Sequence, residues 1–67
     1  MNHIYKYEDF VGSSPEGSDT AIANAVARAA RTMPNLSWFE VRQIRGQIVD
    51  GAVAHWQVEI RVGGRLE

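Results

Sequence analysis

The clearest pattern of apolar and polar positions lies near the end of the chain, in residues 52–62, AVAHWQVEIRV. Apolar and polar side chains alternate there, which is typical of a strand with one face against a core and one face open. The apolar positions are Ala54, Trp56, Val58, Ile60 and Val62, and the polar ones are His55, Gln57, Glu59 and Arg61.

A second strand is predicted over residues 36–45, LSWFEVRQIR. Asp50-Gly51 between the two segments is a strong signal for a tight hairpin turn. Phe39 and Val41 are expected to extend the apolar face of the hairpin. The opposite face then carries side chains from both strands, namely Trp38, Glu40, Arg42, His55, Gln57 and Glu59.

The first part of the chain predicts one strand and one helix. Residues 3–12, HIYKYEDFVG, are rich in aromatic and β-branched types and end at a glycine, although Lys6, Glu8 and Asp9 interrupt the alternation. Ser14 is a plausible N-cap and Pro15 suits the first helical position, with a start one turn later left open by Gly17 and Ser18.

The helix is expected to end near Met33, because the ring of Pro34 cannot continue it. Ile22, Val26, Ala29 and Met33 are spaced to form one apolar face. One helix and three strands then make an α+β domain of order β-α-β-β. In this domain a largely antiparallel sheet is covered by the helix on one face only.

The length of 67 residues allows a single domain, residues 1–67, and a small core. Domains this small usually need stabilisation beyond their own core, and because the chain has no cysteine, disulfides cannot provide it. Association with further copies is the remaining common source. The net charge of −1 argues against nucleic acid as a partner, and no apolar run is long enough for a membrane span. The lack of cysteine and of a targeting signal favours the cytoplasm.

Trp38 is the sharpest sign of function, because it stands on the polar face of its strand. It suits either packing between copies or a stacking platform for a flat ligand. Gln57, on the same face, could hydrogen-bond the polar edge of a heterocycle, or it could merely be solvated. Arg42, Arg45, Arg61 and Arg65 suit either surface ion pairs or the capture of a phosphate.

The expected register separates Trp38 from Gln57. If Asp50-Gly51 is a two-residue loop, Gln57 faces Ile44, and about six strand residues, roughly 20 Å, lie between it and Trp38. A pocket that used both residues would need a bulge, for instance at Gly46, or a second subunit; we take the second subunit as the hypothesis. No nucleophile stands beside a base, and His3 and His55 lack metal-ligand spacing, so neither an enzyme nor a metal site is predicted.

The segment from Leu36 to Glu67, with WFEV, IRG, DGAVAH and WQV in this order, resembles the dodecin family of small flavin-binding proteins. The upstream segment VGSSPEGSDTAIANAVARAARTM resembles the strand end and the alanine-rich helix of that family. The resemblance implies a hollow homododecamer that binds flavins in pairs where subunits meet.

It also implies roles for four residues. Trp38 would stack on the flavin, Gln57 would hydrogen-bond its ring, and Arg45 and Arg65 would contact the flavin or its phosphate. FMN is implied ahead of riboflavin or FAD, and some members also bind coenzyme A. The implied function is flavin storage with quenching of photochemistry, without catalysis. Gly64 departs from the family, whose members commonly carry phenylalanine there. The alternative is a structural or interaction module whose Trp38 face is only an oligomer contact.

Overall fold

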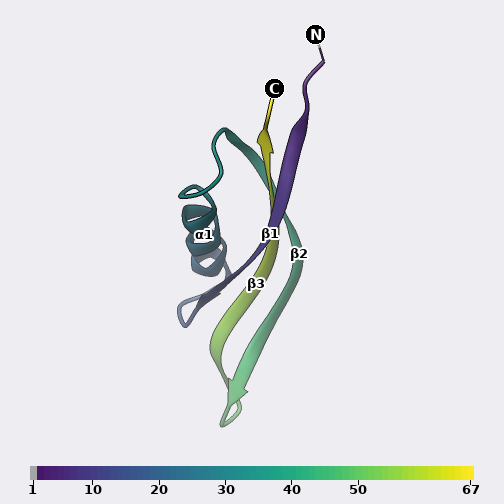
Figure 1. Cartoon of the computed structure of the whole chain (residues 1–67). Coiled ribbons are helices and arrows are strands. Elements are labelled where there is room, and N and C mark those ends of the chain that lie inside the picture. Colours follow the sequence, from purple (N-terminus) through teal and green to yellow (C-terminus); the bar gives the residue numbers. More distant parts are fainter. Residues whose placement is uncertain (1) are drawn as a thin grey trace.

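The structure, a computed structural model that describes residues 2–67, has the predicted order β-α-β-β (Figure 1). Strand β1 spans Tyr5–Ser14, helix α1 spans Ser18–Ala29, β2 spans Leu36–Val49 and β3 spans Ala52–Arg65. The strands form one antiparallel sheet in the order β1-β3-β2, so β3 is central and the other two are edges. The predicted α+β fold class is therefore confirmed.

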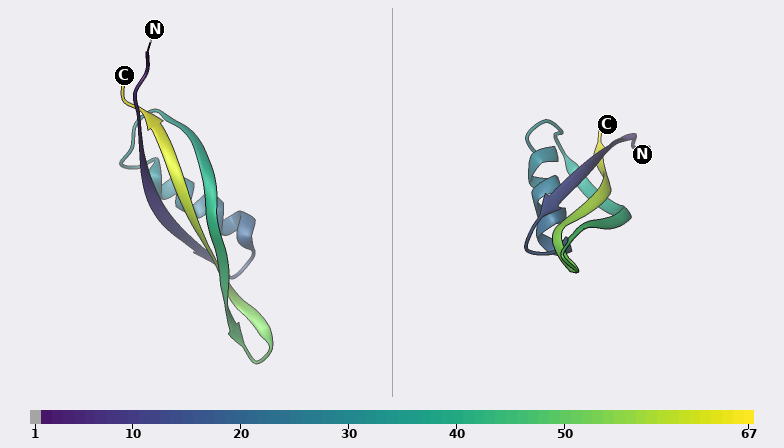
Figure 2. Two further views of the ribbon diagram at one scale, coloured as in Figure 1. Left: turned by 90° about the vertical axis from the view of Figure 1, so that its right-hand side faces the viewer. Right: turned by 90° about the horizontal axis from the view of Figure 1, so that it is seen from below.

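The chain is elongated, with extents of 54 × 19 × 13 Å. The helix covers one face of the sheet near β1, and the β2–β3 hairpin projects beyond both as a bare arm (Figures 1 and 2). Both hairpin strands have 14 residues, whereas β1 has 10. The sheet is thus longer than the helix that packs on it, and part of its apolar face has no cover within the chain.

The core lies between α1 and β3. Val58, Ile60 and Val62 are almost completely buried there, as the alternation in β3 predicted. The helix faces them with a stripe of alanines, Ala21, Ala25 and Ala29, followed by Met33. Of the predicted apolar face, Ala29 and Met33 are buried, whereas Ile22 and Val26 are only partly buried and pack against the margin of the core. Small side chains are needed because Gly12 brings the backbone of β1 against Ala21.

The helix begins at Ser18, the later start that Gly17 and Ser18 had left open, and it ends before the predicted Met33. Ser14 is not its N-cap, because it pairs with Trp56 in the sheet and is buried at the end of β1. Its hydroxyl accepts a hydrogen bond from the Glu16 N–H at 3.0 Å, which shapes the turn before the helix. The N-cap is Gly17, which offers no side-chain cap. The helix ends at Ala29, and residues 30–32 form turns before Pro34.

The Asp50-Gly51 turn is confirmed. Its φ angles of 51° and 76° are both positive, as the tight turn of a twisted hairpin requires. The pairing then departs from the expected register, because Ala54 is an extra residue in β3 and Arg42 is one in β2. The two bulges cancel beyond Arg42, so Trp38 still faces Gly63. Between them the register is shifted by one, and Gln57 faces Arg45 instead of Ile44.

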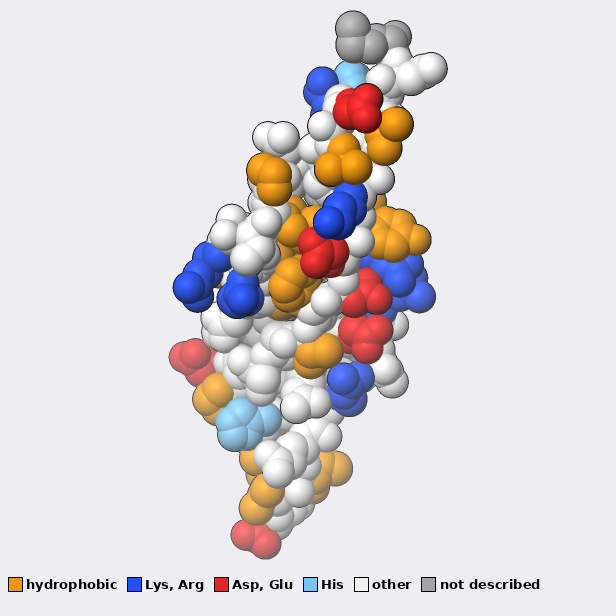
Figure 3. Space-filling view, in the orientation of Figure 1, with side chains coloured by type: hydrophobic (Ala, Val, Ile, Leu, Met, Phe, Trp, Pro, Cys, Tyr) orange, Lys and Arg blue, Asp and Glu red, His pale blue; other side chains and the backbone are white. Residues whose placement is uncertain are grey.

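Apolar side chains of β2 remain exposed. Phe39 and Val41 pair with Val62 and Ile60 on the helix side, as expected, yet they are 48% and 44% exposed because the helix does not reach them. Trp56, expected in the core, is half-buried. Figure 3 shows further hydrophobic side chains on both sides of the hairpin arm, which include Ile48, Val49 and Val53. These surfaces are large for a chain with so small a core.

Gly64 is buried on the helix side of β3. A Cβ atom there would lie 3.0 Å from the Pro34 carbonyl oxygen and 3.3 Å from that of Asn35. The missing side chain thus lets the turn after the helix approach the strand. Within residues 2–67, no helix has the length and apolar character needed to cross a membrane.

Candidate functional site

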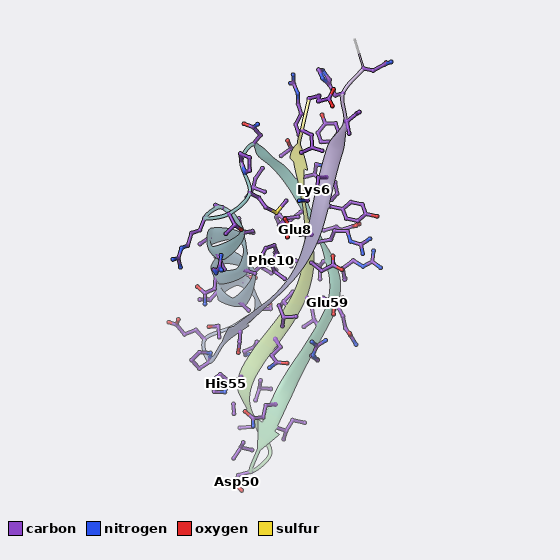
Figure 4. The ribbon with its side chains drawn as sticks, in the orientation of Figure 1. Lys6, Glu8, Phe10, Asp50, His55 and Glu59 are labelled. Atoms are coloured by element: carbon purple, nitrogen blue, oxygen red, sulfur yellow. The ribbon has the colours of Figure 1, made fainter. Side chains whose placement is uncertain are left out.

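The candidate site lies on the face of the sheet that the helix leaves open. Figure 4 shows Phe10 on the helix side of the sheet and Glu59 on the opposite side. The register arranges the open face in rows across β1, β3 and β2. Along the sheet these rows are Tyr7–Gly63–Trp38, Asp9–Arg61–Glu40, Val11–Glu59–Gln43 and Ser13–Gln57–Arg45. Trp38 therefore stands at one end of the face and Gln57 towards the other.

Trp38 lies across Gly63. A Cβ atom on Gly63 would overlap the six-membered ring of the indole, so only glycine leaves room for this placement. Tyr7 approaches from the other side, with ring centroids 6.4 Å apart and an angle of 68° between the planes. Trp38 remains 41% exposed. An indole seated on the sheet with an open surface is a suitable platform for a flat ring.

Gln57 and Arg45, which face each other across the hairpin, are hydrogen-bonded. The Nε of Arg45 donates to the Oε1 of Gln57 at 3.2 Å, and its Nη1 donates to the Oε1 of Gln43 at 3.0 Å. The Glu59 carboxylate lies 3.9 Å from the same guanidinium nitrogen. Because its oxygen already accepts from Arg45, the Gln57 side chain is oriented with its amide nitrogen available to donate.

The structure does not bring Trp38 and Gln57 together within one chain. Trp38 pairs with Gly63 of the central strand β3, and Gly63 lies six residues from Gln57 along that strand. The predicted separation is therefore confirmed, although the predicted partner of Gln57 was wrong. Gln57 lines an open hollow of about 480 Å³ together with Ser13, Gly46, Gln47 and His55. Trp38 is not part of its lining.

The four arginines singled out in the sequence do not form one cluster. Arg65 lies beyond Trp38, at the end of the sheet opposite Arg45; its Nε donates to the Glu67 carbonyl oxygen at 3.0 Å. It lines a second open hollow, of about 510 Å³, with Asn35, Leu36, Ser37, Leu66 and Glu67. Arg42 lies 3.7 Å from Glu40, and both are well exposed, so this ion pair contributes little.

Arg61 makes the strongest ion pair of the open face. Its Nε and Nη2 donate to the two carboxylate oxygens of Asp9 at 2.8 and 3.2 Å. These hydrogen bonds hold the pKa of the Asp9 carboxyl below its ordinary value of 3.8 and raise the pKa of Arg61. The guanidinium carbon also lies 4.3 Å above the centre of the Tyr7 ring. Asp9, Arg61 and Tyr7 thus form a connected group that ends at Trp38.

Sequence reasoning missed three parts of this site. Tyr7 was placed only within the first predicted strand, and Gly63, directly after residues 52–62, was not singled out, because neither residue type signals a role without its neighbours. The Asp9–Arg61 pair joins residues 52 positions apart, so no local pattern reveals it. Among the described residues, no group of three or more His, Asp or Glu side chains is placed to hold a metal ion.

Three comparisons relate the chain to known proteins. The family model described as Dodecin matches residues 4–67. A dodecin from Thermus thermophilus is 48% identical over 67 residues, which cover 100% of this chain and 97% of the relative. A dodecin structure from Streptomyces davaonensis is 55% identical with a TM-score of 0.93, covering 100% of this chain and 98% of that one. One from Streptomyces coelicolor is 57% identical with a TM-score of 0.92, covering 98% and 94%.

The fold thus defines a small α+β domain with one helix on a long antiparallel sheet and an aromatic pair on the open face. The chain belongs to the dodecin family, as the match over nearly its whole length establishes. The resemblance noted in the sequence is confirmed. The comparisons do not support the coenzyme A site that the resemblance implied for some members.

Proposed function

We propose that this protein binds and stores flavin, with the ring stacked on Trp38 where copies of the chain meet, and quenches the excited flavin. The observation that carries this proposal is the placement of Trp38: its indole lies across Gly63, and 41% of the residue is exposed on a largely polar face. An electron-rich indole in such a position can stack on an isoalloxazine ring. From that position it can donate an electron to the excited state, and return of the electron restores the flavin unchanged.

Gln57 is the proposed partner for the polar edge of the flavin ring. The hydrogen bond from Arg45 occupies its oxygen at 3.2 Å and directs its amide nitrogen outwards as a donor. Since Gln57 lies six residues from Gly63 along β3, it would serve the flavin on Trp38 of another copy, not of its own chain. Arg65, beyond Trp38, and Arg45 are the proposed contacts for a ribityl or phosphate group, and FMN is the first ligand to test.

Assembly into a homo-oligomer, expected from the family to be a dodecamer, supports this arrangement. The described chain exposes Phe39, Val41 and Ile44 along β2, an edge strand whose outer edge pairs with no other described strand. Exposed apolar strips and unpaired strand edges are stabilised when another copy covers them. The same association would place Gln57 of one chain near Trp38 of its neighbour. The competing function is a structural module with no ligand, in which the Trp38 face would serve only as a contact between copies of the chain.

A titration combined with a mass measurement separates the two functions. Light scattering should give the mass of a multimer, and FMN or riboflavin added to it should lose its fluorescence in a saturable way. Lumichrome, which keeps the ring system and lacks the ribityl chain, tests whether the ring alone is recognised. A multimer in whose presence FMN keeps its full emission at saturating protein would contradict flavin binding and leave the structural module. A monomer that binds flavin through both residues would contradict the shared site.

A further inference from the structure

A connected group of three residues, Tyr7, Arg61 and Asp9, lies beside Trp38 on the open face. Tyr7 in β1 and Trp38 in β2 both face Gly63 of the central strand, one from each side. Neighbouring strands are about 4.8 Å apart, so side chains on the two outer strands start about 10 Å from each other. Their ring centroids are nevertheless only 6.4 Å apart. Both rings therefore lean inwards over the space that the missing side chain of Gly63 leaves.

Tyr7 is itself held in place from the next row. The Arg61 guanidinium lies 4.3 Å from the centre of its ring, within the range of a cation–π contact. Arg61 is directly opposite Asp9 in the sheet, and two hydrogen bonds of 2.8 and 3.2 Å fix the plane of its guanidinium. Two hydrogen bonds to one carboxylate favour an orientation of the planar guanidinium over the ring that it covers.

The surroundings of Arg61 favour this fixed orientation. The guanidinium faces Asp9 on one side and has Glu40 as its register partner on the other, so its positive charge lies between two carboxylates. Its side chain is 23% exposed, whereas that of Asp9 is 46% exposed. Arg61 is thus the most enclosed member of this row.

We propose that Tyr7, with Arg61 and Asp9 behind it, positions Trp38 for ligand stacking. This inference rests on the proposed function, because it assigns supporting residues to the same flavin platform. Stacking and electron transfer both require the indole to keep one orientation, and a site is held there by neighbours whose own conformations are locked. The indole lies over Gly63 and meets the Tyr7 ring at its side, so it keeps one orientation before a ligand arrives.

The test replaces Tyr7 and Arg61 and measures the dissociation constant together with the residual emission of FMN at saturation. Tyr7→Leu removes the aromatic wall, and we expect binding to weaken about two- to tenfold. The bound flavin should also be brighter than in the unmodified protein. Tyr7→Phe keeps the ring and should preserve both values. Arg61→Met should resemble Tyr7→Leu, and Arg61→Lys should not restore the native emission, because an ammonium has no planar fork.

Arg28→Met, on the exposed side of the helix, is the matched control for Arg61→Met and should leave both values unchanged. A change in stability alone would not alter the emission of bound flavin in protein of native mass. If Tyr7→Leu and Arg61→Met bind FMN and quench it as the unmodified protein does, the positioning role is wrong. Should Tyr7→Leu fail to assemble, Arg61→Lys decides, since it keeps the charge and the alkyl stem.

A measurement without flavin separates this inference from the proposed function. In a Trp56→Phe background Trp38 is the only tryptophan, and its fluorescence anisotropy decay reports how freely the indole moves. We expect Tyr7→Leu to add fast motion that is absent with Tyr7 and with Tyr7→Phe. If the unmodified protein bound no flavin, the proposed function would fail. The decay would still decide whether Tyr7 fixes the indole, and an unchanged decay would overturn the inference.

Discussion

The two faces of the sheet use the same strands in different ways. On the helix side, Val58, Ile60 and Val62 pack against alanines of the helix. At Gly12 the helix lies too close to β1 for a Cβ atom. On the open side, aromatic and charged residues contact each other at the surface and hold one another's orientation. Stability within the chain therefore comes mainly from one face, and the candidate site occupies the other. Substitutions on the two faces should accordingly change different quantities.

The largest expected effect compares two isoleucines on the helix side. Ile60 is fully buried, whereas Ile44 is 52% exposed on the part of β2 that the helix does not cover. Ile60→Ala should cost about 2–5 kcal/mol in the free energy of unfolding. Ile44→Ala should instead weaken association, so its effect in urea denaturation should grow as the protein is diluted. If both variants lost the same stability at every protein concentration, the division of the sheet into a part covered by the helix and an uncovered part would be contradicted.

Two glycines provide the next comparison. A Cβ atom at Gly12 would overlap the carbonyl oxygen of Ala21, while one at Gly17 meets nothing within 4 Å. Backbone atoms cannot move aside as a flexible side chain can, so Gly12→Ala should cost about 3 kcal/mol. Gly17→Asn should add a helix cap and stabilise the chain slightly. Thermal unfolding of both variants checks this prediction. If Gly12→Ala unfolded at the same temperature as the unmodified protein, the helix would have to be able to shift away from β1.

On the open face, Trp38→Ala should weaken flavin binding by about 1–3 kcal/mol, by analogy with bases stacked on aromatic residues. Because Trp38 lies outside the core, the free energy of unfolding should change by about 1 kcal/mol or less. Trp56→Phe, on the helix side, is the control and should leave the quenching of flavin intact. Equal dissociation constants for Trp38→Ala and the unmodified protein would show that the indole is not the platform.

The smallest effect concerns acid. The hydrogen bonds from Arg61 lower the pKa of Asp9 in the folded chain. The pair therefore contributes stability above the ordinary value of 3.8, and this contribution is lost as the pH falls through that value towards the lower folded pKa. Asp9→Asn should be less stable than the unmodified protein at neutral pH, and the difference should shrink below pH 3.8. A difference that stays constant with pH would exclude the ion pair as its source.

Local patterns in the sequence were sufficient for the type and order of the elements and for the buried face of β3. The Asp50-Gly51 turn was predictable because its two positive φ angles suit few other residue pairs. Burial of Val58, Ile60 and Val62 followed from alternation alone. The placement of Trp38 on the open face likewise followed from its position in the second predicted strand.

The tertiary structure decided which residues of the site meet. The bulges at Ala54 and Arg42 bring Gln57 opposite Arg45, and a bulge depends on how two whole strands fit, not on a local motif. The alanines face the sheet instead of Ile22 because the helix must lie close to Gly12. Tyr7, Asp9 and Arg61 act on Trp38 only because a central glycine lets side chains of the two outer strands approach each other above it. Such contacts join distant positions, so they exist only once the sheet has formed.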